Sequence, residues 1–557
     1  MKVFHNVVRS GRIASRVPGF WCCKQWSARP RLFSSARSQS TGVSRFTYGL
    51  SLLTAVAVTA VVTQNASKLR RDHESAMSGN VASPSAKPCY ADKATMLIAL
   101  NEIRLALGDE AVSMDFDDIE AHGFSEHSTS NVDNRPLAVV MPNSTEEVST
   151  VAKICSKYKV PMIPFGAGSS VEGNTCAPYS GFSIDLSRMD KIVEIHEEDM
   201  DVVVQPGVNW VNLNDTLKST RLFLPLDPSP TAHIGGMVAT NCSGTNAMRY
   251  GTMKDWVLNL TVVLADGTVI KTKRRPLKSS AGYNLNALFT GSEGTLGIVT
   301  EATLKLATVP SHFGVATTAF TSVKHATKAA TTMIRKGVPL AALELMDEVQ
   351  MRVINQTGGA ANRTWPEKPT LFIKFSGTED VVKDSIVACK TIAEAHGGTE
   401  FVIATEEKAM NDLWSARKQA LWAMLAVRPE GSQIWSTDVA VPLSRLADIV
   451  DQSKSNASET GLFNSVLGHV GDGNFHQAVM YHADKPEEVK AVKSCVDRMI
   501  ENALLMEGTV SGEHGIGLGK RYCLEKELGP TTIAVMKTLK RSIDPHWLLN
   551  PGKVIDF

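Results

Sequence analysis

The sequence predicts a large α+β protein that follows a basic leader and an apolar segment. Short strand-like runs alternate with helical patterns between residues 134 and 272, and glycine-rich loops interrupt this region. The chain has 557 residues, of which 43% are hydrophobic and 21% charged, enough to bury at least two cores. We therefore expect a folded body of more than one domain.

The leader is the first element. Residues 1–71 contain no aspartate or glutamate, while lysines and arginines punctuate a serine-rich stretch up to Arg45. This composition is typical of a mitochondrial presequence, which we place at residues 1–45. A basic arm that binds nucleic acid is the alternative, but an apolar segment follows at once, so we expect no nucleic-acid partner.

The apolar segment is the second element. Residues 46–67 carry no charge, and as a helix they would span roughly 33 Å, enough for a bilayer core of about 30 Å. We interpret the segment as a single membrane anchor, with an apolar end of the presequence as the alternative. Positive charge is heavier before the segment than after it, so the body would project from the inner mitochondrial membrane into the intermembrane space.

A linker and an N-terminal helical region occupy residues 68–133. Residues 75–88 are rich in Ser, Ala, Gly and Pro, which is typical of a flexible tether, and a short acidic helical region follows. Next comes a helical pattern at 145–158 among strand-like segments. The strand-like segments are 137–141, 162–165, 192–195, 201–205, 260–264 and 269–272.

A glycine-rich loop over residues 166–173 follows the strand at 162–165. Its unobstructed backbone N–H groups suit phosphate oxygens. No Gly-x-Gly-x-x-Gly follows a first strand and no Gly-Lys-Ser/Thr closes the loop, so neither a Rossmann site nor a P-loop is indicated. An ordinary turn is the alternative, but two further small-residue segments, 235–244 and 291–299, strengthen the interpretation of the loop as a nest for phosphate oxygens.

Histidines and a glutamate near the carboxyl end form the most informative pattern. His469 and His476 bracket a Gly-Asp-Gly turn, and Glu513 and His514 follow in a Gly-Glu-His-Gly segment. Two imidazoles and a carboxylate can hold a divalent ion and leave an open position, as a catalytic zinc site requires. His514 would lie beside it as a base. The alternative is a set of ordinary polar turns with locally bonded histidines.

Other metal and redox motifs are absent. The sequence contains no His-Glu-x-x-His, and its nine cysteines include no Cys-x-x-Cys pair. These absences argue against that type of zinc peptidase, a thiolate zinc site, a redox dithiol and a disulfide-stapled secreted scaffold.

Taken in order, the motifs resemble the vanillyl-alcohol-oxidase type flavoproteins, whose FAD-binding domain is of the PCMH type. Within this family, the chain is similar to the D-2-hydroxy-acid dehydrogenases. The match runs from about Asn134 to Phe557. The segments that carry it are 164–170, 205–208, 291–299, 469–476, 512–515 and 550–553.

The resemblance implies an FAD-binding domain of two α+β subdomains over residues 134–310. A cap domain with an antiparallel sheet and the metal site would span 311–535, and residues 536–557 would return to the FAD-binding domain. FAD would be bound non-covalently, with His233 as the candidate if attachment were covalent. The implied FAD contacts are Pro164, Gly166, Ala167, Gly168, Ser169, Ser170, Gly235, Gly236, Gly291, Gly294, Gly297, Ile298, Asn550 and Lys553.

The resemblance also implies a reaction, the oxidation of D-lactate to pyruvate with hydride transfer to FAD and electrons passed to cytochrome c. His469, His476 and Glu513 would bind zinc or manganese, and His514 would deprotonate the substrate hydroxyl. Arg417 would hold the substrate carboxylate, because its planar fork binds bidentately. Less central expectations are that Asn474 orients a ligand and that Trp414, Trp422 and Trp435 belong to the cap core.

Three alternatives remain open at this point. A D-2-hydroxyglutarate dehydrogenase would share these residues and add a cation for the second carboxylate. A metal-dependent hydrolase would use the same three ligands, with the glycine-rich loops serving only structure. A membrane-tethered flavoprotein could also have become a non-enzymatic assembly factor, although the intact histidines and Glu513 argue against it.

Overall fold

The computed structural model describes residues 87–358 and 360–557. The expected presequence and membrane anchor, and most of the expected tether, lie outside these residues. Within the described part of the chain, no helix is both long enough and apolar enough to span a membrane.

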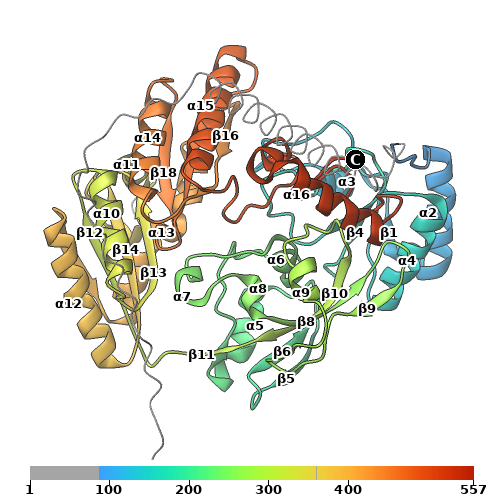
Figure 1. Cartoon of the computed structure of the whole chain (residues 1–557), viewed down its shortest axis with the longest axis horizontal. Helices are drawn as coiled ribbons and strands as arrows, with labels where there is room; N and C mark the ends of the chain where they lie inside the picture. Colours follow the sequence, from blue (N-terminus) through green and yellow to red (C-terminus); the bar gives the residue numbers. More distant parts are fainter. Residues whose placement is uncertain (1–86, 359) are drawn as a thin grey trace, which may run out of the picture. The chain divides into compact units, whose positions relative to one another are not determined.

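The first subdomain is a four-stranded sheet in the order β1-β2-β4-β3. Figure 1 shows β1 and β4 in the same part of the molecule as helices α2 and α4. Three strands run parallel and β1 is antiparallel to β2. The helices α2 and α4 pack against each other, and their apolar side chains share a core with the sheet. The elements are α2 (Lys93–Leu107), β1 (Val112–Ser113), α3 (Phe116–Gly123), β2 (Ala138–Val140), α4 (Thr145–Tyr158), β3 (Met162–Phe165) and β4 (Phe182–Asp185).

The second subdomain is an antiparallel five-stranded sheet in the order β5-β6-β10-β8-β9. Helices α5, α6 and α9 contribute to its core. A two-stranded ladder of β7 and β11 adjoins it in sequence. The strands are β5 (Ile192–His196), β6 (Asp201–Val204), β7 (Leu222–Phe223), β8 (Val257–Val263), β9 (Val269–Lys271), β10 (Ile298–Lys305) and β11 (Ala307–Thr308), and the helices are α5 (Trp210–Leu217), α6 (Ile234–Thr240), α7 (Ala247–Tyr250), α8 (Met253–Trp256) and α9 (Leu285–Phe289).

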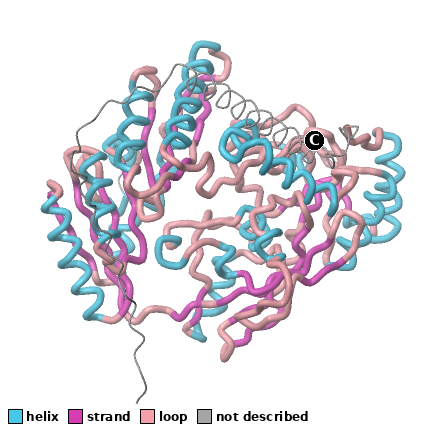
Figure 2. Tube along the Cα trace, viewed as in Figure 1, coloured by secondary structure: helices cyan, strands magenta, loops and turns pink. Residues whose placement is uncertain are grey.

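The cap domain is built on an antiparallel sheet in the order β15-β12-β14-β13-β18-β19-β16, with β17 paired to β19. Figure 2 shows its strands flanked by helices. The elements are β12 (His312–Ala319), α10 (Val323–Arg335), β13 (Leu340–Met346), α11 (Glu348–Gln356), β14 (Thr370–Gly377), α12 (Glu379–Ala395), β15 (Thr399–Ala404), α13 (Glu407–Ala426), β16 (Ser432–Ser436), β17 (Val439–Ala440), α14 (Leu446–Ser458), β18 (Asn464–Gly468), β19 (Asn474–His482) and α15 (Pro486–Leu505).

Both faces of the cap sheet are buried. One face packs against α10, α12, α14 and α15, and the other against α11 and α13. Burial on both faces explains why β13, with the sequence Leu-Ala-Ala-Leu-Glu-Leu-Met, is almost continuously apolar rather than alternating. Glu344, the one charged residue in this strand, is therefore a buried charge that needs partners.

The carboxyl end of the chain returns to the first subdomain. Helix α16 (Arg521–Ile543) leads to a segment in which Leu549 forms a parallel bridge with Met162 of β3. Asn550 donates its backbone N–H to the carbonyl of Met162 at 2.7 Å. Residues 550–553 consequently lie beside the glycine-rich loop that follows β3.

The two expected α+β subdomains and the antiparallel cap sheet are confirmed. One expectation about the cap core was wrong. Trp414 is buried, and Trp435 packs against a core cluster beside β19, but the side chain of Trp422 is 60% exposed. Trp422 lies on α13, which buries only one stripe of its surface, and its ring meets that of His127 edge to face.

Candidate active site

The strand ladder of the cap places His469 and His476 together. β18 and β19 pair with Leu467 opposite His476, and the turn between these strands begins at His469. The carbonyl of His469 accepts the backbone N–H groups of Asp472 and Asn474, which tightens this turn. The two imidazole rings lie 5.4 Å apart, edge to face.

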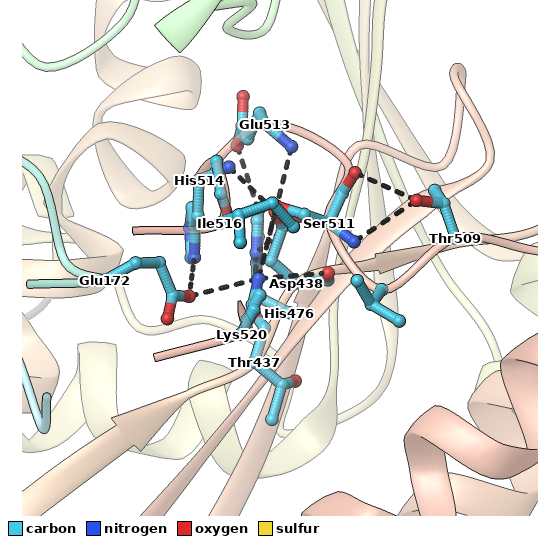
Figure 3. A network of polar contacts seen from close by, with 12 residues as sticks. Glu172, Thr437, Asp438, His476, Thr509, Ser511, Glu513, His514, Ile516 and Lys520 are labelled. Atoms are coloured by element: carbon cyan, nitrogen blue, oxygen red, sulfur yellow. Dashed lines mark hydrogen bonds and ion pairs between the residues drawn. The ribbon is translucent and has the colours of Figure 1, made fainter. Parts of the chain in front are cut away.

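Glu513 and His514 come from the loop between α15 and α16, and Asp438 holds that loop in place. One carboxylate oxygen of Asp438 accepts the backbone N–H groups of Glu513 and His514, at 2.9 and 2.8 Å, and the hydroxyl of Ser511 at 2.9 Å. Figure 3 shows these residues converging with His476 and Lys520. Because Asp438 is almost fully buried, each of these bonds is made away from water.

The same loop is fastened to the FAD-binding domain. Glu293 accepts the backbone N–H groups of Ile516 and Gly517, at 2.7 and 2.8 Å. The carbonyl of Glu172 accepts those of Leu518 and Gly519. A Cβ at Gly517 would lie 2.1 Å from that carbonyl, and its φ of +49° is left-handed, so the close approach requires glycine. The segment that carries Glu513 and His514 is thus held by both domains.

The three expected metal ligands meet at one point. Glu513 Oε1 lies 3.0 Å from His469 Nε2 and 3.1 Å from His476 Nε2, and the ligand atoms all lie within 4.8 Å of one another. Burial would raise the pKa of Glu513, but the two imidazoles hold it well below its usual value. Burial would lower the pKa of His469, but Glu344 and Glu513 raise it well above its usual value. This donor set fits a zinc-like ion bound by nitrogen and oxygen.

Each ligand ring is also held on its far side. His469 Nδ1 lies 3.0 Å from Glu344 Oε1, and His476 Nδ1 lies 3.0 Å from the carbonyl of Thr437. A third contact, from Ser243 of the FAD-binding domain, reaches the second oxygen of Glu513. Contacts at Nδ1 of both rings direct each Nε2 toward Glu513, the arrangement in which the three groups could share an ion.

His514 lies against this cluster with a defined orientation. Its ring stacks on that of His476, with 4.9 Å between centroids and 8° between planes. Its Nδ1 faces Glu172 at 3.5 Å, and Lys520 Nζ contacts the same carboxylate oxygen at 3.0 Å (Figure 3). Burial would lower the pKa of His514, but Asp438 and Glu172 raise it above the usual value. Nδ1 is directed at Glu172, so Nε2 is the nitrogen left for proton transfer.

Arg417 is the expected carboxylate clamp, and it is paired within the protein. Its Nε and Nη2 each lie 2.9 Å from Oε2 of Glu344. The other oxygen of Glu344 faces His469. Arg417 is therefore connected through Glu344 to His469 of the expected metal-ligand cluster. The Nη1 group of Arg417 has no partner among the described residues.

Several of the expected FAD contacts lie around the loop after β3. A Cβ built on Gly236 meets nothing within 4 Å, and the nearest neighbours of one on Gly166 are Gly236 N and His233 Cβ at 3.9 Å. Gly294 packs against Pro164, and Gly291 against Asn241. The Lys553 ammonium donates to the carbonyl of Cys176, and burial lowers the pKa of Lys553 to about 7.

Buried polar atoms in the same region support a ligand there. His233 Nδ1, Asn174 Oδ1, Thr290 Oγ1 and Asn550 Oδ1 are buried without a hydrogen-bond partner. Such atoms are costly to leave unsatisfied, so they indicate that polar groups from outside the chain complete the site. The open space at Gly236 and these unpartnered atoms together form a cradle that fits a dinucleotide cofactor.

Some expected contacts face elsewhere. A Cβ at Gly297 would meet Val262, and the side chain of Ile298 is buried in the core of the first subdomain, so only the backbone of these residues is left to contact FAD. Gly235 packs against Pro206. No side-chain contact is recorded for Ala167, Ser169 or Ser170, and Ser169 is exposed. Asn474 does reach the site, where its amide lies beside Gly512 and its Oδ1 is buried without a partner.

Several residues of the site were not anticipated from the sequence. Glu344 and Asp438 lie far from the histidine motifs in the chain, whereas Lys520 follows His514 by six residues. Glu172 and Ser243 were noted only as parts of small-residue segments. Glu344 had a usable signal, because a single carboxylate inside an apolar strand requires partners. Asp438 and Ser243 had none, since only the tertiary fold brings them to the cluster, and Lys520 is close in the chain but lies in no motif.

Two family models match the chain. The model described as "FAD binding domain" matches residues 136–273, and that described as "FAD linked oxidases, C-terminal domain" matches residues 309–554. These two ranges correspond to the FAD-binding domain and to the cap with the C-terminal segment.

The chain is also similar to curated proteins and to a solved structure. It is 44% identical over 480 residues to a mitochondrial D-lactate dehydrogenase [cytochrome] of Kluyveromyces lactis, covering 84% of this chain and 82% of that protein. It is 44% identical to a protein of the same name from Arabidopsis thaliana, covering 82% and 80%. The structure of p-cresol methylhydroxylase with substrate bound aligns with a TM-score of 0.68 at 19% identity, over 84% of this chain and 99% of that one, which indicates a shared fold.

Proposed function

This chain belongs to the FAD-linked oxidase family that contains the mitochondrial cytochrome-linked D-lactate dehydrogenases, and from this premise we propose that it oxidises D-lactate to pyruvate. It is an FAD-dependent oxidoreductase. The proposed activity corresponds to EC 1.1.2.4. The observation that carries the proposal is the cluster of His469, His476 and Glu513 with His514 stacked beside it.

Oxidation of a 2-hydroxy acid removes a proton from the hydroxyl and a hydride from C2. FAD, when bound in the cradle, supplies the acceptor for the hydride. A divalent ion held by His469, His476 and Glu513, either zinc or manganese, would make the hydroxyl more acidic. A metal-dependent hydrolase would need the metal ion but no hydride acceptor. The FAD cradle therefore supports an oxidoreductase rather than a hydrolase.

His514 is the residue that takes the hydroxyl proton. Glu172 faces Nδ1, so the ring can present an unprotonated Nε2 to the substrate and store the proton there. Asp438 fixes the backbone of the loop through two N–H groups, which keeps the ring close to the three ligands. Glu172 faces Nδ1 at 3.5 Å without a hydrogen bond, and its negative charge favours the ring proton on that nitrogen.

Arg417 is the residue proposed to hold the substrate carboxylate. Glu344 occupies Nε and Nη2 of its guanidinium, which leaves Nη1 for a substrate oxygen. The ion pair fixes the plane of the guanidinium before substrate arrives, and less rotamer freedom is then lost on binding. Asn474, with its unpartnered carbonyl oxygen beside Gly512, is a further hydrogen-bonding group for substrate or ligand.

Cytochrome c is the proposed electron acceptor. We expect the purified full-length holoenzyme to reduce ferricytochrome c with D-lactate at a kcat/KM at least tenfold above that with L-lactate or D-2-hydroxyglutarate. Each D-lactate supplies two electrons, so two cytochromes should be reduced for each pyruvate formed. The measurement is the initial rate of cytochrome reduction with each acid. A higher kcat/KM for D-2-hydroxyglutarate would reject D-lactate as the preferred substrate and leave the flavin chemistry in place.

The proposed location is the mitochondrion, with the anchor in the inner membrane and the catalytic body in the intermembrane space. Support comes from the basic leader, which contains no aspartate or glutamate, and from the uncharged segment over residues 46–67. We expect added protease to degrade the body in mitoplasts, whose outer membrane is open, but not in intact mitochondria. Immunoblots of both preparations give the answer, with a matrix protein as the control. A body still protected in mitoplasts would contradict this placement.

A further inference from the structure

We propose that Glu344 is a positioning residue that fixes one metal ligand, His469, and the carboxylate clamp, Arg417, in a single arrangement. The inference rests on the proposed function, because it assigns a role to Glu344 through the metal and substrate groups of the same site. No motif contains this residue, and it acts from the middle of the cap sheet.

The strand register delivers Glu344 to His469. β13 and β18 pair in antiparallel fashion with Leu345 opposite Gly468, so the next residues outward, Glu344 and His469, lie opposite each other. Oε1 of Glu344 lies 3.0 Å from His469 Nδ1. The contact is therefore built into the sheet rather than reached by a flexible side chain.

The second oxygen of Glu344 faces α13. Arg417 projects from that helix and contacts Oε2 through Nε and Nη2, both at 2.9 Å. The carboxylate is 1% exposed and the arginine side chain 12% exposed. Water screens such a buried pair little, so the geometry is held firmly.

Both partners of Glu344 must donate to it. Arginine has only donors, and His469 has to carry its ring proton on Nδ1 if Nε2 is to bind an ion. A carboxylate accepts at both oxygens and satisfies both partners at once. An amide would present an NH₂ group to one of them. If the amide oxygen stayed with Arg417, the NH₂ group would face His469 Nδ1 and favour the tautomer whose proton blocks Nε2.

The test is the affinity of the full-length, FAD-loaded protein for Zn²⁺ in the wild type and in Glu344→Gln, measured by competition with a chromophoric chelator. We expect Glu344→Gln to raise the Zn²⁺ dissociation constant by about 10- to 100-fold, the effect of losing an outer hydrogen-bond partner of a ligand. FAD content, read from the flavin absorbance, should not change. Added Zn²⁺ should restore part of the lost kcat, which a simple folding defect would not allow.

Asp347→Asn is the matched control. Asp347 is also a fully buried carboxylate of the same segment, paired with Lys454 Nζ at 2.6 Å, but it does not touch the ligand cluster. We expect Asp347→Asn to lower the melting temperature and to leave the Zn²⁺ affinity at the wild-type value. Equal Zn²⁺ affinity in wild type and Glu344→Gln would overturn the role of Glu344 and leave the metal site in place. An equal loss of Zn²⁺ affinity in Asp347→Asn would do the same. A wild-type protein that binds no Zn²⁺ or Mn²⁺ would overturn the metal site as well.

Discussion

Flavin reduction by D-lactate is expected to slow about 10²- to 10⁴-fold when His514 is replaced by alanine, the range typical of the loss of a general base. The ring of His514 stacks on that of His476, a proposed metal ligand, and its Nδ1 faces Glu172, which leaves Nε2 to take the proton. The measurement is the rate of flavin bleaching after anaerobic mixing with D-lactate.

The pH dependence gives this prediction a second readout. A base must be unprotonated to work, so the wild-type rate should rise with pH through the pKa of His514, which Asp438 and Glu172 raise against the effect of burial. His514→Ala should lose this rise. His482→Ala, in the same cap domain but paired with Glu488 away from the cluster, should keep both the rate and the profile. A His514→Ala protein with the wild-type rate and profile would show that another group removes the proton.

Replacement of Glu513, a proposed metal ligand, is expected to have an equally large effect. Its Oε1 lies within 3.1 Å of Nε2 of both His469 and His476. The two imidazoles would bind an ion as neutral donors, so Glu513→Gln removes the one negative charge of the proposed ligand set. A Lewis acid stabilises the charge of the transition state by several kcal/mol, and each 1.4 kcal/mol of activation free energy changes the rate about tenfold. We therefore expect kcat to fall about 10³-fold. Metal content and kcat are measured on the same preparation.

Chelation should reproduce this loss in the wild type, and stoichiometric Zn²⁺ or Mn²⁺ should reverse it. Glu301→Gln is the control variant, because Glu301 lies on β10 in an ion pair with Lys271, outside the site. Full activity in a chelated protein shown to contain no divalent ion would contradict the metal assignment and leave His514 to act alone.

Much of the fold was visible in the sequence because its signals are local. The helix at residues 145–158 and the strand at 162–165 have the expected bounds, since an amphipathic period and a glycine-rich boundary act over a few residues. Strand β4 was missed. It is four residues long and fully buried, and a short apolar run of this kind has no period to distinguish it.

The same distinction between local and long-range signals applies to the site. His469, His476, Glu513 and His514 lie in two short motifs, and the structure brings them together as expected. The partners that orient them come from remote segments: Glu344 from β13, Asp438 from the start of β17, and Glu172 from the FAD-binding domain. Their placement depends on strand register and on the docking of one loop between two domains, and neither is written in a local pattern. Arg417 was anticipated, but its pairing with Glu344 was not.

The most direct test of the central claim is an anaerobic stopped-flow absorbance scan of the purified full-length protein mixed with D-lactate. We predict a flavin band that D-lactate bleaches within one turnover, that L-lactate bleaches far more slowly, and that ferricytochrome c restores. A protein that carries flavin but is not bleached by D-lactate would contradict the proposed substrate, and a colourless protein that binds no FAD would contradict the flavoenzyme assignment itself.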